Sequence, residues 1–302
     1  MKISLKQNSS EIIEPWNKKA LPSEKDSALH LFSLMEKINA EAKQGFLMYG
    51  IRCADSGVQS TPEQHTRTVH PNLNSTRRFG QTKDYRGSIL ETYLKKLGKL
   101  NSLQQEVLIG LMLGDGNLSV GKIGKNCSLK YDQKITHSSL VNLVYLIFEP
   151  FVGSPPSIRY KNKVEHSLWF RTFRLPQLFF YYGQFYGLNA NGQRIRGIPK
   201  LLHRWITPIS LAFWFMDDGS KAPYGYMLHT ENFLLTECKY LQQLLGKKFG
   251  LEVTIHSDTR PKTNSMSKTY YKLYIRASSR SLFTKLISPY IIPSMRYKLH
   301  LN

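Results

Sequence analysis

The apolar residues of the chain concentrate in two short runs that each end in an acid and a glycine. Leu108 to Gly116 reads LIGLMLGDG, and Leu211 to Gly219 reads LAFWFMDDG. Both runs are apolar on nearly every side, which predicts short helices buried between other elements. Glycine commonly ends a helix because it enters the left-handed conformation at little cost. We therefore expect Asp115 and Asp218 at the carboxyl ends of two buried helices.

Local signals also mark where both helices begin. Ser102 and Gln105 form a candidate capping box, while Thr207 followed by Pro208 is a favourable pair of N-cap and first helical residue. Each run therefore carries the start and stop signals of a complete short helix.

Two glycines four residues apart, Gly110 and Gly114, leave a flat strip on one face of the first helix. Two such helices lying side by side would bring Asp115 and Asp218 together at one end. Carboxylates at helix C-termini favour a cation, and their hard oxygen atoms suit Mg²⁺. Either run alone is more often a buried helix with an acidic turn. The pair, at equivalent positions, favours a metal site.

The remaining pattern predicts one order of elements twice: strand, strand, helix, strand, strand, helix. In the first half, strands are expected at Cys127 to Gln133, Ser157 to Lys163 and Leu168 to Phe173, with helices at Ser139 to Phe148 and Pro176 to Tyr186. In the second half, strands are expected near Tyr226 to His229, Glu252 to His256 and Tyr271 to Arg276, with helices near Thr236 to Phe249 and Ser281 to Ile287. Ile198-Pro199 and Ile292-Pro293 end the halves alike, which predicts an internal repeat with a pseudo-twofold axis.

Residues 1–100 are predicted to be an N-terminal extension, partly helical and partly disordered linker. A helix is expected from Ser23, with Ala28, Leu31, Leu34, Met35 and Ile38 on one face, and another over Ile89 to Leu100. Gly50 to Gly87 is polar and rich in turn residues, so it is interpreted as the linker. The halves are assigned to residues 101–206 and 207–302.

Lys and Arg outnumber Asp and Glu by 42 to 21, which gives a formal charge of +21 and a pI near 9.8. A polyanionic partner is expected, most simply nucleic acid. Apolar runs such as Leu140 to Phe148 are far shorter than the roughly 20 residues that span a bilayer, so no membrane role is predicted. A basic structural protein of a ribonucleoprotein would explain the charge but not the paired motifs.

The cysteines and the N-terminus bear on location. Cys53, Cys127 and Cys238 have no zinc-like or disulfide-like spacing, which is typical of a reducing compartment. The first residues lack an apolar secretion core, and Glu11 and Glu14 argue against an ordinary transit peptide. The abundance of Lys, Asn, Ile, Tyr and Phe fits an AT-rich organelle genome. We expect an organelle-encoded protein, mitochondrial rather than chloroplast.

The two motifs resemble the paired signature of the LAGLIDADG homing endonucleases, of the double-motif, single-chain type encoded in organelle introns. ISLAFWFMDDGSK is especially close to the second motif of these enzymes, and the similarity continues to PSMRYKL near the C-terminus. The resemblance spans Leu103 to Leu301. It implies an α+β fold of two pseudo-symmetric αββαββα halves that form a DNA-binding saddle, with the motif helices packed at the central interface of a monomer.

The resemblance also implies an activity: Mg²⁺-dependent hydrolysis of both strands of a long, specific DNA site, leaving short 3′ overhangs. Asp115 and Asp218, with the backbone carbonyls of Gly114 and Asp217, would hold the divalent ions. The alternative is a group I intron RNA maturase on the same scaffold, with or without nuclease activity. Two carboxylates held close together favour the nuclease, because they would repel each other for no gain without a metal.

Two cations complete the site that the resemblance implies. Lys298 is one, and Arg196 occupies a position where the family commonly has Lys. Arg keeps the charge but cannot transfer a proton near neutral pH, so Lys200 or Arg194 could take over, or Arg196 could contact only the phosphate backbone.

Basic residues at alternate strand positions are the candidate DNA contacts, because β-ribbons can enter the major groove. Arg159, Lys161 and Lys163 are expected on one strand face, with Ile158 and Tyr160 on the other. For each single charge an ordinary solvated face is an equal alternative. The full set is Lys130, Lys134, Arg159, Lys161, Lys163, Arg171, His256, Lys272 and Arg276.

Overall fold

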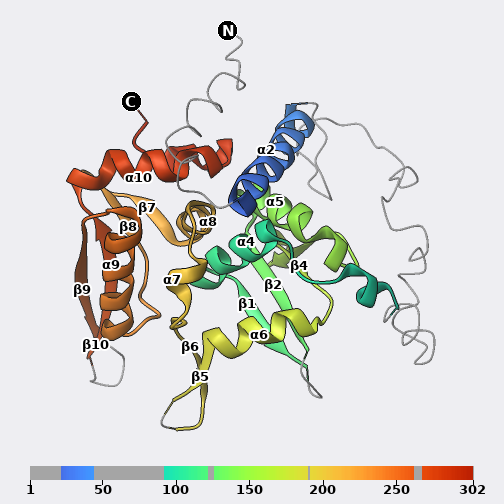
Figure 1. Ribbon diagram of the computed structural model, residues 1–302, viewed down its shortest axis with the longest axis horizontal. Helices are drawn as coiled ribbons and strands as arrows, with labels where there is room; N and C mark the ends of the chain where they lie inside the picture. The colour runs from blue at the N-terminus through green and yellow to red at the C-terminus, as the bar shows by residue number, and fades with distance from the viewer. Residues whose placement is uncertain (1–21, 44–91, 122–125, 190, 262–266, 302) are drawn as a thin grey trace.

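Two antiparallel four-stranded sheets with the same strand order flank a central pair of helices (Figure 1). The computed structural model describes residues 22–43, 92–121, 126–189, 191–261 and 267–301. The first sheet has the order β1-β2-β4-β3 and consists of β1 (Asn117–Val120), β2 (Cys127–Lys134), β3 (Ser157–Lys161) and β4 (Val164–Arg171). The second has the order β7-β8-β10-β9 and consists of β7 (Gly219–Lys221), β8 (Tyr226–Leu228), β9 (Val253–Pro261) and β10 (Ser267–Ile275). The matching orders confirm the predicted α+β fold and its internal repeat.

The helices follow the predicted sequence of elements. The central pair is α4 (Ser102–Leu113) and α8 (Pro208–Asp218). The first half, from α4 to α6, also contains α5 (Ser138–Phe148) and α6 (Pro176–Phe185); the second half, from α8 onward, contains α9 (Leu235–Phe249) and α10 (Arg280–Ile287). A two-stranded ribbon, β5 (Tyr186–Leu188) and β6 (Arg194–Arg196), and the short α7 (Leu202–Trp205) connect the halves. Short 3-10 segments are η1 (Ile135–His137), η2 (Glu149–Phe151), η3 (Ala277–Ser279), η4 (Ser288–Tyr290) and η5 (Pro293–Lys298). A further short helix covers residues 92–97, within the helix predicted over Ile89 to Leu100.

The glycine strip of α4 is where α8 packs. A Cβ atom on Gly110 would lie 2.5 Å from the carbonyl oxygen of Ser210, and a Cβ on Gly114 would lie 2.6 Å from the Cβ of Asp217. Real Cβ atoms do not approach other atoms so closely, so both positions require glycine at this helix separation. The side chains of α8 from Leu211 to Met216 are fully buried, as their all-round apolar pattern predicts.

The capping box of α4 lies one residue earlier than predicted. Asn101, not Ser102, is the N-cap: its Oδ1 accepts a 2.8 Å hydrogen bond from the amide of Gln104, whose Oε1 accepts one of 2.9 Å from the amide of Asn101. Asn caps a helix as well as Ser, so two overlapping boxes were available in the sequence. Thr207 is the N-cap of α8, as predicted, and accepts from the amide of Ser210 at 3.2 Å.

The predicted N-terminal helix is α2 (Pro22–Lys43), and it packs on both halves. Ala28, Leu31 and Met35 are buried against the core, and the ring of Phe32 stacks on Tyr290 of η4 at 5.8 Å. This helix therefore joins the first half to the second. The predicted linker from Gly50 to Gly87 lies outside the described residues.

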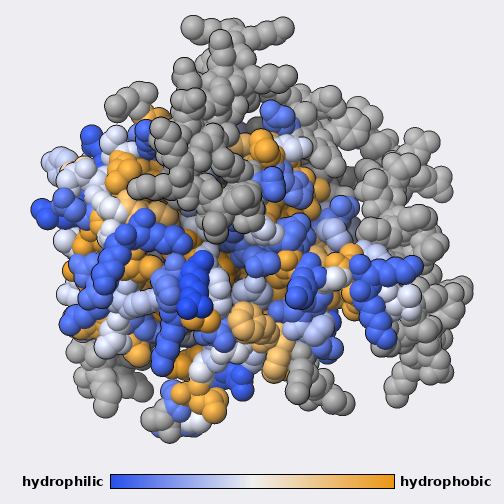
Figure 2. Space-filling view, viewed as in Figure 1, coloured by the Kyte–Doolittle hydropathy of each residue, from blue (hydrophilic) through white to orange (hydrophobic). Residues whose placement is uncertain are grey.

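The surface is largely hydrophilic on the face drawn in Figure 2. Hydrophilic side chains lie over α7 and α9, and a hydrophobic patch lies over α6. Cys127 and Cys238 are buried free thiols. Among the described helices, none is both long and apolar enough to span a membrane.

Candidate active site and nucleic-acid interface

The two predicted acids meet at one end of the helix pair. Asp115 is exposed in the turn that follows α4, where the amide of Gly116 returns to the carbonyl of Leu111 at 2.8 Å. Asp218 is the last residue of α8, and its carbonyl accepts a 2.8 Å bond from the amide of His229. Burial, reinforced by the negative charge of Asp115, raises the pKa of Asp218 to about 7. The two carboxylates thus lie within electrostatic range.

A third acid, Asp217, crosses the interface between the halves. Its carboxylate accepts hydrogen bonds from the hydroxyl of Tyr131, from Nε2 of Gln133 at 3.1 Å and from the amide of Asp115 at 3.2 Å. Gln133 Nε2 also donates to Oδ2 of Asp115 at 2.7 Å, so it bridges the two acids. The side chain of Asp217, predicted only to lend its carbonyl, therefore organises the turn that carries Asp115.

Tyr131 and Gln133 were not predicted as site residues. Both belong to the alternate positions of β2 that also include the buried Cys127 and Leu129. A hydroxyl and an amide at the end of an otherwise apolar strand face require buried polar partners, and this was the available signal. The partner that makes these two residues part of the site is Asp217, which lies 86 positions after Tyr131 and 84 after Gln133. Local sequence patterns therefore did not identify them.

The donor set fits a divalent cation. Burial raises the pKa of Asp217 well above its usual value, and the charges of Asp115 and Asp218 add to the effect. The carboxyl groups of Asp115 and Asp218 offer hard oxygen ligands, which Mg²⁺ prefers. Within the described residues no three His, Cys, Asp or Glu side chains form a complete cage, so backbone oxygens such as those of Gly114 and Asp217 would be needed as well.

One cation lies beside the end of each motif helix. Lys298 is 8% exposed and donates a 2.6 Å hydrogen bond to the carbonyl of Met216. Burial lowers the pKa of its amine, against the opposing influence of the three aspartates. Arg196 donates a 2.7 Å hydrogen bond to the carbonyl of Gly116. Arg194 instead lies over the ring of Tyr182, at 4.9 Å from its centroid, so Arg196 is the cation placed at the first motif.

The comparisons with known proteins identify the family of this chain. The profile of the LAGLIDADG DNA endonuclease family matches residues 105–283. The chain belongs to this family. It is 33% identical over 213 residues to the "Cytochrome b mRNA maturase bI2" of Saccharomyces cerevisiae, over 67% of this chain and 48% of that protein. It is 30% identical to the "Probable intron-encoded endonuclease 1" of Wickerhamomyces canadensis, over 71% of this chain and 91% of the relative.

A solved structure shares the architecture. The homing endonuclease I-WcaI bound to its DNA recognition sequence aligns over 76% of this chain and 99% of its own, with 29% identity and a TM-score of 0.58. This likeness confirms the predicted two-part LAGLIDADG saddle. The chain spans about half the length of the Saccharomyces cerevisiae relative.

Four of the nine predicted DNA contacts of this LAGLIDADG chain share a face of the first sheet, and two others share a face of the second. The ladder pairs Lys130 with Arg171 and Lys134 with Ser167, and Ser167 also pairs with Arg159. Cross-strand partners point to the same side, so these four cations share the face that we call the saddle face of the first sheet. In the second sheet Lys272 lies opposite His256, which places both on one face there.

The predicted alternation along β3 is wrong beyond Arg159. Arg159 lies opposite Ser167, whereas Tyr160 lies opposite Glu165, because a bulge shifts the register between them. Tyr160 therefore shares the face of Arg159, and Lys161 points to the other face. Lys163 lies outside the strand, in the turn, with a φ of 65°.

Acidic neighbours partly neutralise the saddle faces. Asp132 pairs with Lys130 at 3.1 Å and with Arg159 at 3.0 Å. Lys272 pairs with Glu231 at 3.3 Å, and Arg276, just past the end of β10, lies 3.6 Å from Glu252. Any polyanion that binds the saddle faces must compete with these pairs.

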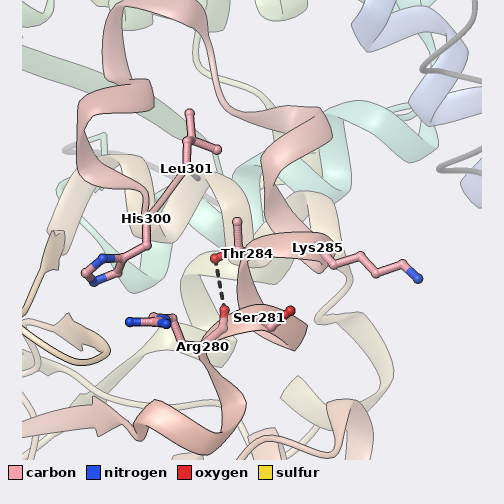
Figure 3. A pocket seen from close by; sticks show the side chains of 6 residues that line it. All are labelled: Arg280, Ser281, Thr284, Lys285, His300 and Leu301. Atoms are coloured by element: carbon pink, nitrogen blue, oxygen red, sulfur yellow. Dashed lines mark hydrogen bonds between the residues drawn. The ribbon is translucent and has the colours of Figure 1, made fainter.

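A separate cavity of about 320 Å³ lies against α10 and the C-terminal residues (Figure 3). Its lining is Arg280, Ser281, Thr284, Lys285, His300 and Leu301. His300 Nε2 already lies 2.9 Å from the carbonyl oxygen of Ala222, and Lys285 extends away from the other side chains. None of the three aspartates lines it, so it is not the candidate active site.

Proposed function

We propose that this protein is a site-specific DNA endonuclease that hydrolyses both strands of a long duplex site with the aid of Mg²⁺. The observation that carries the proposal is the convergence of Asp115 and Asp218 at the ends of the two packed motif helices, with one cation beside each. The family membership and the likeness to I-WcaI support it. We further propose that the protein acts as a monomer, since one chain supplies both halves.

In this mechanism the residues of the chain would bind the divalent ions and position them against the scissile phosphates. Asp115 and Asp218, with the carbonyls of Gly114 and Asp217, would hold divalent ions against the scissile phosphates. Held there, such ions would supply the activation of water and the stabilisation of the leaving oxygen. The Gln133 amide fixes the Asp115 carboxylate through its 2.7 Å hydrogen bond. Lys298 and Arg196 lie where positive charge would offset the extra charge of the transition state.

DNA binding is proposed for the saddle faces, through Lys130, Lys134, Arg159, Arg171, His256 and Lys272. Lys161, Lys163 and Arg276 would contribute less, because the first two leave the strand face and the third is paired at the sheet end. The aromatic ring of Trp169, with Lys130 at 5.8 Å and Arg159 at 5.7 Å, holds two of these cations in place.

The test is cleavage of a library of long duplexes with Mg²⁺, followed by sequencing of the ends. Discrete ends with short 3′ overhangs, lost on addition of EDTA, are expected. Asp218→Asn should lower the rate by about 10³-fold, because a metal ion contributes several kcal/mol to such reactions, and should leave duplex affinity intact. Wild-type cleavage by this variant would refute the assignment.

A second candidate function is that of an intron RNA maturase on the same scaffold. The name of the Saccharomyces cerevisiae relative favours it. Tight binding of a folded intron transcript, with faster splicing in its presence, would support this role, and it can coexist with cleavage. For the location we propose an organelle, with the mitochondrion first.

A further inference from the structure

An aromatic cluster on the outer side of α6 has no role in the proposed DNA cleavage. Leu178, Tyr182 and Phe185 form the buried face of α6 against the first sheet, and Phe180 lies on the opposite side with 52% of its surface exposed. The outer side of α6 therefore faces away from the first sheet. Figure 2 shows a hydrophobic patch over α6 on the face drawn there.

Three rings from two elements hold one another in this cluster. Phe180 meets Tyr181 at 5.3 Å between centroids and Trp205 of α7 at 5.9 Å, while Tyr181 and Trp205 are 6.0 Å apart. All three contacts are edge-to-face, a preferred geometry for aromatic pairs. Tyr181 and Trp205 are half-buried and so fix the orientation of the exposed Phe180 ring. A flat ligand would meet a preorganised surface.

The stretch of chain that carries these rings is basic and contains no acidic residue. From His166 to Met216 the sequence contains no Asp or Glu. Arg194, Lys200 and Arg204 from this stretch are exposed, and none of them forms an ion pair with the described part of the chain. Among the saddle-face cations, in contrast, Lys130 and Arg159 are paired with Asp132, and Lys272 is paired with Glu231.

An acid from the second half does approach this stretch, but its oxygens are occupied. Glu237 accepts a 2.9 Å hydrogen bond from the amide of Ile198 and one of 2.7 Å from the amide of Leu234. It closes a backbone junction between the halves. The positive charge of Lys200 and Arg204 thus remains available to a polyanion, whereas Arg194 lies over the ring of Tyr182 on the buried face of α6.

We propose that this α6–α7 surface, formed by Phe180, Tyr181, Trp205, Lys200 and Arg204, binds single-stranded RNA. An unpaired base would stack on Phe180, and the flanking phosphates would contact the two cations. Duplex DNA does not fit this chemistry, because its base faces are hidden in the stack. RNA is the partner chosen because its loops and bulges expose unpaired bases. The site includes none of the aspartates and does not depend on the proposed cleavage.

The test compares two exposed aromatic residues by fluorescence anisotropy with a labelled, unstructured 15-nucleotide RNA and the full-length protein. Phe180→Ala should weaken RNA binding about tenfold, the order expected for one lost base stack. Phe180→Tyr, which keeps a stacking ring, should retain wild-type affinity. Tyr224, 71% exposed between β7 and β8, provides the control: Tyr224→Ala should stay within twofold of wild type.

Two further nucleic acids, a DNA duplex and a single-stranded DNA, test whether RNA is the partner. A DNA duplex should bind Phe180→Ala as it binds wild type, and a single-stranded DNA of the same sequence should bind wild type more weakly than the RNA does. Unchanged RNA affinity in Phe180→Ala, or an equal loss with Tyr224→Ala, would overturn the site. Equal affinity for both single strands would overturn the assignment to RNA. A matching thermal midpoint for all variants excludes misfolding as the cause.

Discussion

The two motif ends are built from the same plan but are not chemically equivalent. Gly114 in the first motif corresponds to Asp217 in the second. Leu228 pairs with Gly219, and extending the ladder of β1 and β2 by one residue places Tyr131 opposite Gly116. Tyr131 thus corresponds to Leu228, and Gln133, two residues further, corresponds to Thr230.

The three differences between the motif ends (Gly114 against Asp217, Tyr131 against Leu228, and Gln133 against Thr230) depend on one another. Asp217 requires space beside its Cβ, which Gly114 provides, and polar partners, which Tyr131 and Gln133 provide. In the second half Leu228 has no polar group to offer, and Thr230 is fully buried with its hydroxyl bonded to the carbonyl of Tyr271. The fold is pseudo-twofold symmetric, but this polar cluster is present only at the end of the first motif. The two DNA strands should meet two different chemical environments.

Substitutions in this polar cluster should slow the cleavage of one DNA strand more than that of the other. Asp217→Ala and Gln133→Ala each deprive Asp115 of a supporting hydrogen bond, and loss of such support around a metal ligand typically costs about 10–100-fold in metal affinity or activity. We expect one strand to be cut more slowly than the other, so nicked DNA should accumulate in a time course with each strand labelled separately. Thr230→Ser, which retains the hydroxyl on the second side, is the matched control. Equal slowing of both strands by Asp217→Ala would contradict the one-sided assignment.

The helix contact beneath the cluster can be tested through its glycines. Gly110→Ala should lower the free energy of unfolding by about 1–3 kcal/mol, because the added methyl overpacks α8. Gly183 of α6 has no atom within 4 Å of an added Cβ, so Gly183→Ala should stabilise the protein by up to about 1 kcal/mol. Urea unfolding of both variants measures the difference. A Gly110→Ala variant as stable as wild type would show that the helices do not pack this closely.

The pH dependence of the second motif follows from the raised pKa of Asp218, about 7. A carboxyl group must lose its proton to bind a metal ion, so divalent-ion affinity should fall about tenfold as the pH drops from 8 to 6. Because the pKa is higher in the folded than in the unfolded protein, the metal-free protein should lose stability as the pH rises through the same range. Calorimetric titration with Ca²⁺ at both pH values measures the affinity. In Asp218→Asn the proton-linked part of this dependence should disappear; if it persists, another group is responsible.

The smallest expected effect distinguishes the two sides of β3. Arg159→Ala should weaken duplex binding and lower the slope of log affinity against log salt by about 1, the value for one lost phosphate contact. Lys161→Ala, two positions along the strand but turned to the other face by the bulge, should change the slope by less. Anisotropy titrations from low to moderate salt measure both. Equal slopes for the two variants would show that the bulge does not sort the cations.

The sequence identified most elements of the fold because their signals are local. The apolar runs, the Thr207-Pro208 start and the Gly110 and Gly114 spacing depend only on residues within a few turns of one another. The repeat of these signals after about a hundred residues predicted the two halves. Asp115 and Asp218 followed as the acids at two equivalent helix ends.

Tertiary structure decided the features that arise from pairing between distant segments. Lys161 changes face because the opposite strand forces a bulge, and alternation along one strand cannot reveal that. Asp217 acquires its role only through Tyr131 and Gln133, which the packing of α4 on α8 brings to it. The face of α2 was predictable from its apolar spacing, but its contact with both halves was not. Local propensity thus determined which segments form and which acids end them, whereas long-range packing determined the partners that each acid and cation meets.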